Sequence, residues 1–145
     1  NTNLIRDGFF TPGVRQAERL HRDKVEDVID FLNLQPYRDK PINSLPYGVR
    51  KVAEIARALC IEPTLILLDE PSSGLNPEET EDLAFWIQDI NRLRGITIIL
   101  VEHDMRLVKE VSHTVVAINS GRVLAKGKPQ DVLNNAEVVR AYLGS

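Results

Sequence analysis

The sequence of 145 residues is poor in features that would each point to a particular class of protein. It contains a single cysteine, Cys60, so no disulfide bond can form within the chain. Its longest strongly apolar runs, residues 65–68 and 96–101, are far shorter than the roughly 20 residues that a membrane-spanning helix needs. No apolar segment typical of a signal peptide follows Asn1, so a soluble protein in a reducing compartment is the default expectation.

A further absence concerns phosphate binding. The loop that grips phosphates in many nucleotide-binding proteins has the pattern G-x-x-x-x-G-K-[ST]. Gly127-Lys128 does not fit it, because Arg122 stands at the first glycine position and Pro129 follows the lysine. No other stretch qualifies, and we interpret Gly127-Lys128 as a turn. The chain begins with asparagine and not methionine, which suggests a fragment, a processed chain or a truncated one.

The composition that is present is typical of an ordinary globular domain. Hydrophobic residues make up 43% of the chain and charged residues 27%. The length is sufficient for one domain with a hydrophobic core. The net charge of -3 shows no basic excess, so we predict no nucleic-acid partner.

The first part of the sequence has helical patterning. Apolar residues at i, i+3, i+4 and i+7 predict one buried helix face within residues 14–34. Three prolines in residues 35–46 predict a loop, and a second helix is expected over residues 47–60. The apolar face of the first helix consists of Val25, Val28, Ile29 and Leu32.

The second part has the pattern of a βαβ unit. Residues 64–68 and 96–101 are short continuous apolar runs, which predict parallel strands buried on both faces. Between them, Asn76 is a good N-cap, Pro77 suits the first helical position, and Glu79 stands where a capping-box acid would. Gly95 ends the predicted helix.

The last third of the sequence completes this reading. We expect a short helix over residues 104–111, then a hairpin with strands 114–118 and 122–125, then helices near 129–133 and 136–143. The chain is therefore predicted to be an α/β protein in two parts: a helical subdomain, 1–60, and an α/β half, 61–145.

Chemistry-bearing residues follow both predicted parallel strands. Asp69 and Glu70 stand at the carboxyl end of the first strand, and His103 stands just past the second. Parallel strands end at the same sheet edge, where ligands bind in open α/β sheets. Nucleotide hydrolysis needs one carboxylate for the Mg²⁺ shell and another group to orient the attacking water. The alternative is that Asp69 and Glu70 only form a solvated strand end. The other two histidines, His21 and His113, are interpreted as surface residues.

A second candidate lies before the helix expected at residues 47–60. A glycine-containing loop that leads into a helix N-terminus can bind an anion through free backbone N–H groups and the helix dipole. The residues concerned are Pro46, Tyr47, Gly48 and Val49. A plain helix start is the alternative.

In order and spacing, these segments resemble the motif series of the ATP-binding-cassette (ABC) transporter ATPases, over essentially the whole chain. The Pro-Tyr-Gly form of the first motif and the Glu-His-Asp-Met of the last resemble the branched-chain amino acid uptake group. The segments that carry the resemblance are Leu45-Pro46-Tyr47-Gly48-Val49, Glu54-Ile55-Ala56-Arg57-Ala58-Leu59, Leu65-Ile66-Leu67-Leu68-Asp69-Glu70-Pro71, Ser73-Gly74-Leu75-Asn76-Pro77 and Val101-Glu102-His103-Asp104.

The resemblance implies a role for each motif. Asp69 would hold Mg²⁺, Glu70 would act as general base or orient water, and His103 would contact the γ-phosphate of ATP. The signature residues Pro46, Tyr47, Gly48 and Val49, and the D-loop residues Ser73, Gly74 and Asn76, would contact the nucleotide. The chain departs from the family's usual residues at Pro46, Val49 and Asn76.

The resemblance also implies the assembly. ATP would be closed between two head-to-tail ATPase subunits, which would sit on the inner face of the cell membrane by binding transmembrane permease subunits, with Phe9 and Phe10 near that contact. The fold implied is the C-terminal part of a P-loop NTPase. The family's Walker A loop would lie before Asn1, so we expect this stretch alone to be inactive.

Other functions remain open at this point. The chain could be a non-catalytic module that binds a partner, or part of a lipopolysaccharide-export ATPase. An ABC-type DNA-repair or chromosome ATPase is less compatible, because residues near the N-terminus show no sustained heptads. The transported solute cannot be deduced, since the ATPase does not contact it.

Overall fold

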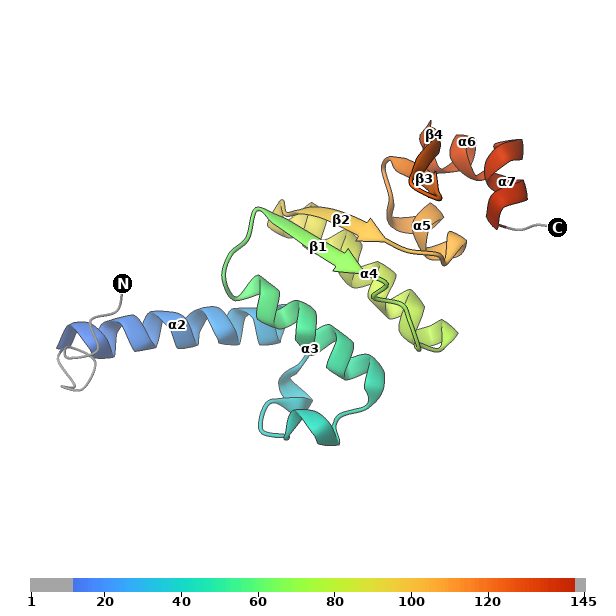
Figure 1. The fold of residues 1–145 in the computed structure, drawn as a ribbon. Helices are drawn as coiled ribbons and strands as arrows, with labels where there is room; N and C mark the ends of the chain where they lie inside the picture. Colours follow the sequence, from blue (N-terminus) through green and yellow to red (C-terminus); the bar gives the residue numbers. More distant parts are fainter. Residues whose placement is uncertain (1–11, 143–145) are drawn as a thin grey trace. The chain divides into compact units, whose positions relative to one another are not determined.

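The computed structural model describes residues 12–142 and divides the chain into two compact units, Asn1–Pro63 and Thr64–Ser145 (Figure 1). Phe9 and Phe10 lie outside the described residues. Among the described helices, none is long and apolar enough to cross a membrane.

The first unit is helical. Within residues 12–63, two α-helices are separated by a loop that contains two short 3₁₀ turns, η1 and η2, where the sequence predicted a loop without helix. Val28 and Leu32 are buried as predicted, whereas Val25 is 41% exposed. The elements are α2 (Pro12–Phe31), η1 (Gln35–Tyr37), η2 (Ile42–Ser44) and α3 (Tyr47–Leu59).

Helix α2 ends three residues before the predicted boundary. Asn33 has a left-handed backbone with φ of 54°, a conformation that asparagine tolerates better than most residues. The N–H of Leu34 then donates to the carbonyl of Ile29 at 2.8 Å, in the manner of a helix C-cap. Apolar periodicity alone does not reveal this stop, because Leu34 is itself buried.

Cys60 immediately follows α3 and is a half-buried free thiol. Burial raises the pKa of this thiol. A reactive cysteine needs a lowered pKa, so this environment favours an unreactive, structural thiol.

The described part of the second unit, residues 64–142, contains two small sheets and four helices. The predicted order of elements is confirmed, and the boundaries differ from the prediction by one or two residues. The elements are β1 (Leu65–Asp69), α4 (Pro77–Arg94), β2 (Thr97–Val101), α5 (Met105–Val111), β3 (Val115–Asn119), β4 (Arg122–Gly127), α6 (Pro129–Leu133) and α7 (Ala136–Tyr142).

Strands β1 and β2 are parallel, and Leu65 pairs with Thr97 at one end and Asp69 with Val101 at the other. The prediction that these strands are buried on both faces is wrong for this chain. Ile66 is 6% exposed, but Leu67 is 71% and Ile99 50% exposed. Within residues 12–142, only one face of the strand pair is covered, the face on which α4 packs. The side chains along each strand therefore alternate between more buried and exposed.

Helix α4 has the caps that its sequence predicts. The Asn76 side chain accepts a hydrogen bond from the Glu79 N–H at 3.0 Å, and the Glu79 carboxylate accepts one from the Asn76 N–H at 3.0 Å. Gly95 follows the last turn with φ of 66°, a conformation that glycine adopts without strain. The inward face of the helix carries Leu83, Ala84, Ile87 and Ile90.

The C-terminal elements form a second, smaller core. Strands β3 and β4 are antiparallel and joined by Ser120-Gly121, which both have positive φ, as a tight hairpin turn requires. Ala117 of β3 packs with Val132 of α6 and Val138 of α7. This core fixes the hairpin against the last two helices.

Truncation of α4 tests the main core of the second unit. Ile90 is fully buried, so Ile90→Ala should lower the free energy of unfolding by about 2–5 kcal/mol through lost contacts and a cavity. Leu93 lies one turn further along the helix and is 60% exposed, so Leu93→Ala should change it by less than about 0.5 kcal/mol. Urea unfolding followed by circular dichroism measures both, and equal effects would contradict the core assignment.

Candidate functional site

The carboxyl ends of β1 and β2 lie side by side. Asp69 is the last residue of β1 and pairs with Val101, the last residue of β2. The N–H of Glu70 continues the pairing by donating to the Val101 carbonyl at 2.8 Å. The sheet edge that the sequence singled out therefore holds Asp69, Glu70 and His103 together, as predicted.

Glu70 and His103 face each other across this edge. The Nδ1 atom of His103 lies 3.6 Å from Oε1 of Glu70, and both side chains are open to solvent, at 66% and 54% exposure. Glu70 has φ of 44°, an uncommon value for a residue with a side chain. Such backbone strain is common at functional sites, where the chain around it holds the residue in place.

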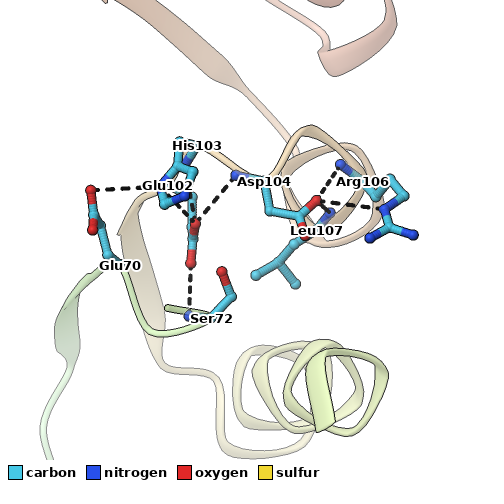
Figure 2. Close-up of polar contacts among 7 residues, drawn as sticks. All are labelled: Glu70, Ser72, Glu102, His103, Asp104, Arg106 and Leu107. Carbon is cyan, nitrogen blue, oxygen red and sulfur yellow. Dashed lines mark hydrogen bonds and ion pairs between the residues drawn. The ribbon is translucent and has the colours of Figure 1, made fainter. Parts of the chain in front are cut away.

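Glu102, to which the sequence analysis gave no role, accepts several hydrogen bonds at this edge. The Glu102 carboxylate is completely buried. Its Oε1 accepts a hydrogen bond from the Ser72 N–H at 2.8 Å, and its Oε2 accepts from the N–H groups of His103 at 3.0 Å and Asp104 at 3.4 Å (Figure 2). The sequence did hold a signal for this role: Glu102 stands between a predicted strand and a helix N-cap, where backbone N–H groups lack partners.

The environment of Glu102 favours its ionised form. Burial raises the pKa of this carboxyl group, but hydrogen bonds from Ser72, Asp104 and His103 together outweigh burial and lower the pKa below its usual value. The buried carboxylate therefore carries its charge at neutral pH, compensated by the Ser72 side chain and by backbone N–H groups.

The segment after Glu70 turns sharply before α4. The Ser73 N–H donates to the Glu70 carbonyl at 3.1 Å, and Gly74 has φ of 79°. Asn76 uses its side chain for the capping box of α4, so its predicted contact with nucleotide would have to be made alongside this structural role. An open cavity of about 520 Å³ is lined by Ser73, Gly74 and His103, among others.

The arrangement suits one divalent cation that would be held by a single carboxylate together with the phosphate oxygens of a bound molecule. Within residues 12–142 no three His, Cys, Asp or Glu side chains form a metal-binding group. Asp69 is an exposed single carboxylate at the strand end. Mg²⁺ at phosphate sites is usually held by one or two carboxylates plus phosphate oxygens and water, so Asp69 fits that chemistry.

The predicted signature residues form a separate group in the first unit, at the start of α3. Pro46 is the N-cap residue, Tyr47 is exposed and Val49 is half-buried. Gly48 is buried, which the sequence did not predict. This group belongs to the first unit, whereas the sheet edge belongs to the second.

Two basic residues at the start of α3 were missed by the sequence analysis. The guanidinium carbon of Arg50 lies 5.3 Å from the centre of the Tyr47 ring, and Nζ of Lys51 lies 5.7 Å from it. Cations stack favourably on aromatic rings at such distances. Together with the N-terminal end of the helix dipole, they make this end of α3 electropositive.

Comparison with known proteins identifies the family. A family model described as ABC transporter matches residues 4–73, and one described as branched-chain amino acid ATP-binding cassette transporter matches residues 122–145. Over 144 residues, 99% of its length, the chain is 38% identical to the high-affinity branched-chain amino acid transport ATP-binding protein BraF of Pseudomonas aeruginosa. The chain belongs to the ABC transporter ATP-binding family.

Other relatives agree with this assignment to the ABC family. The high-affinity branched-chain amino acid transport ATP-binding protein LivG of Salmonella typhimurium is 37% identical over 143 residues, 99% of this chain. The chain spans 56% of the length of BraF and of LivG. The lipopolysaccharide export system ATP-binding protein LptB of Haemophilus influenzae is 36% identical over 123 residues, 85% of this chain and 51% of LptB.

Solved structures confirm the ABC ATPase fold. The ADP conformation of MJ1267, an ATP-binding cassette of an ABC transporter, aligns with a TM-score of 0.80 at 28% identity, over 86% of this chain and 50% of that one. A nucleotide-free ATP-binding cassette from an ABC transporter aligns with a TM-score of 0.76 at 25% identity, over 99% of this chain and 57% of that one. The predicted α/β class and family are thus confirmed.

The lowered pKa of Glu102 gives the stability of this chain a specific pH dependence. The folded state releases the Glu102 proton more readily than the unfolded state, so the contribution to stability is present above the unfolded pKa of about 4.3 and is lost as pH falls through the folded pKa. The parental chain should be more stable than Glu102→Gln at neutral pH, and the difference should shrink below about pH 4.3.

Urea unfolding at a series of pH values measures this difference. Glu81→Gln is the matched control, because Glu81 is an exposed glutamate on α4, and its difference from the parental chain should stay small throughout. A Glu102→Gln difference that stays constant down to about pH 3 would contradict the assignment of an ionised, hydrogen-bonded Glu102.

Proposed function

We propose that this chain is the C-terminal part of the ATP-hydrolysing subunit of an ABC importer for branched-chain or related amino acids. The observation that carries the proposal is the meeting of Glu70 and His103 at 3.6 Å, directly after Asp69, at the carboxyl edge of a parallel strand pair. The similarity to BraF and LivG supports the solute class. We use the term full-length ATPase for a protein as long as BraF or LivG that contains this chain.

The proposed division of labour follows from position and exposure. Glu70 is ionisable, open to solvent and beside His103, so it can take a proton from the water that attacks the γ-phosphate or orient that water. His103 can donate a hydrogen bond to a γ-phosphate oxygen from the same edge. Asp69 would hold Mg²⁺, which would neutralise charge on the phosphates.

Exposed apolar surface supports the proposal that more of the core packs on the second unit. Leu67, Ile99 and Val101 are each at least half exposed on one face of the strand pair. An open cavity of about 1090 Å³ is lined by residues of both β2 and β3, and within residues 12–142 these strands pair only with β1 and β4. Free strand edges and exposed apolar patches are normally covered in stable proteins.

The start of α3 is proposed to act across a subunit interface. Pro46 offers no N–H, so the anion donors would be the backbone N–H groups of Tyr47, Gly48 and Val49. Arg50 and Lys51 add positive charge at the same helix end. The ligand would be the γ-phosphate of ATP held by a second, head-to-tail subunit, with Ser73, Gly74 and Asn76 of the D-loop also near the nucleotide.

The proposed assembly follows the relatives' names. BraF and LivG are transport ATP-binding proteins, so this chain would work in the cytoplasm, bound to the inner face of the membrane through transmembrane permease subunits. A lipopolysaccharide-export ATPase is the second candidate, favoured by the 36% identity to LptB over 123 residues. The match of residues 122–145 to the branched-chain amino acid family model favours the first candidate.

Replacement of Glu70 tests the proposed chemistry. Glu70→Gln keeps the size of the side chain but removes its ability to accept a proton, so ATP hydrolysis by the full-length ATPase should fall by about 10²–10⁴-fold. ATP-bound dimers should accumulate, because binding persists without turnover. Phosphate release and size-exclusion chromatography in Mg-ATP measure the two effects.

Glu81→Gln is the matched control for this experiment, since Glu81 is an exposed glutamate outside the proposed site, and it should hydrolyse ATP at the parental rate. Near-parental hydrolysis by Glu70→Gln would exclude Glu70 as the base. Absence of hydrolysis in the parental full-length ATPase would overturn the proposed function itself.

A charge introduced at Tyr47 tests the proposed role of α3. An acidic residue in the first turn stabilises a helix, so Tyr47→Glu should keep the fold while it repels an approaching phosphate. On the Glu70→Gln background of the full-length ATPase, Tyr47→Glu should abolish ATP-driven dimers and leave nucleotide binding to the monomer unchanged.

Tyr47→Gln is the matched control, because it removes the same aromatic ring without adding charge. It should dimerise clearly better than Tyr47→Glu in Mg-ATP, as measured by size-exclusion chromatography together with nucleotide titration. Equal dimerisation of the two variants would show that no phosphate approaches this helix end. Loss of monomer binding would place the loop's action within its own subunit.

A further inference from the structure

The proposed hydrolysis uses Glu70, His103 and Asp69 but leaves the buried carboxylate of Glu102 without a task. A carboxylate with no exposed surface is costly to bury unless hydrogen bonds compensate its charge. Three backbone N–H groups and the Ser72 side chain do so here. Glu102 is therefore held as a buried anion next to the exposed side chains of Glu70 and His103.

The donors come from two different segments. Ser72, which donates to Oε1, lies two residues after Glu70, whereas His103 and Asp104, which donate to Oε2, begin the segment after β2. Ser72 and Glu102 are 30 residues apart in the sequence. Figure 2 shows the carboxylate between these two segments, with one oxygen toward each.

We propose that Glu102 is a positioning residue: its two carboxylate oxygens join the segment after Glu70 to the segment that carries His103 and thereby set the separation of Glu70 and His103. This inference rests on the proposed function for its meaning in catalysis. The strand pairing ends at Glu70 and Val101. Beyond that point, the hydrogen bonds of the Glu102 carboxylate continue the connection between the two segments.

The chemistry requires a glutamate. Both acceptor atoms are used, each by an N–H donor, and only a carboxylate offers two acceptors in this geometry. In Glu102→Gln the amide NH₂ would have to face either the Ser72 N–H or the His103 N–H, so one segment would be released. Glu102→Asp is shorter by one methylene and cannot span both donors from the same backbone position.

The expected consequence reaches the exposed pair. His103 Nδ1 lies 3.6 Å from Glu70 and 4.0 Å from Oε2 of Glu102. The imidazole therefore lies within 4.0 Å of two carboxylates, the exposed one of Glu70 and the buried one of Glu102. Release of either segment changes where His103 stands relative to Glu70, and misplacement of a catalytic group by about 1 Å can lower a rate by about 10²-fold.

The link itself can be measured in the 145-residue chain without nucleotide. We expect scalar couplings through the hydrogen bonds, from the amide nitrogens of Ser72 and His103 to the carboxyl carbon of Glu102, in nuclear magnetic resonance spectra of the parental chain. Glu102→Gln should speed amide hydrogen exchange at Ser72 or His103, whereas Glu81→Gln should leave both unchanged. Absence of both couplings, or unchanged exchange in Glu102→Gln, overturns the proposal.

The catalytic consequence is measured in the full-length ATPase. Glu102→Gln should lower kcat by about 10- to 100-fold without a change in the Kd for ATP, a split that general destabilisation does not produce. Because Glu102 acts through His103, it should add little to the loss caused by His103→Ala. Parental kcat in Glu102→Gln, or fully additive losses in the double variant, overturns the positioning role.

The two arms separate this proposal from the proposed function. If the parental full-length ATPase hydrolyses no ATP, the proposed function fails, and the couplings and amide exchange in the 145-residue chain still decide whether Glu102 joins the two segments. If hydrolysis is normal and the couplings are absent, the positioning role fails while the proposed function stands.

Discussion

The register of the parallel pair β1–β2 is the constraint on which the rest of the site depends. Asp69 pairs with Val101, and the Glu70 N–H donates to the Val101 carbonyl, so the two strands end level with each other. Side chains alternate along a strand with a period of two, so a slip of one residue would move Ile66 out of the core and carry every residue after the strand end with it. Burial of Ile66 therefore also fixes which residues meet at the edge.

Much of this arrangement could be predicted from the sequence because its signals are local. The capping box of α4, the glycine that ends it and the hairpin turn each depend on a few adjacent residues, and each is found as predicted. The convergence of Glu70 and His103 follows from the rule that parallel strands end at one edge. The end of α2 was missed because a left-handed Asn33 interrupts a pattern of apolar residues that continues to Leu34.

The features that could not be predicted depend on what surrounds a residue. A continuous apolar run predicts a strand with two buried faces, yet Leu67 and Ile99 are exposed in this chain, because composition records what a strand can bury and not what is present to cover it. Gly48 was predicted at an approachable helix end and is buried. The charges of Arg50 and Lys51 near Tyr47 become apparent only once the helix places all three at one end.

Four acids within this one edge show how environment and not residue type assigns a task. Asp69 and Glu70 are exposed and keep their oxygens available for a ligand. Asp104 caps α5 by accepting from the N–H groups of Arg106 at 2.8 Å and Leu107 at 3.2 Å. Glu102 is buried among hydrogen-bond donors, the Ser72 side chain and backbone N–H groups, that keep it ionised. The same chemical group is thus a candidate reactant where solvent reaches it and a structural link where N–H groups take both of its oxygens. The edge needs both kinds, because exposed side chains keep a fixed geometry only if the structure beneath them is rigid.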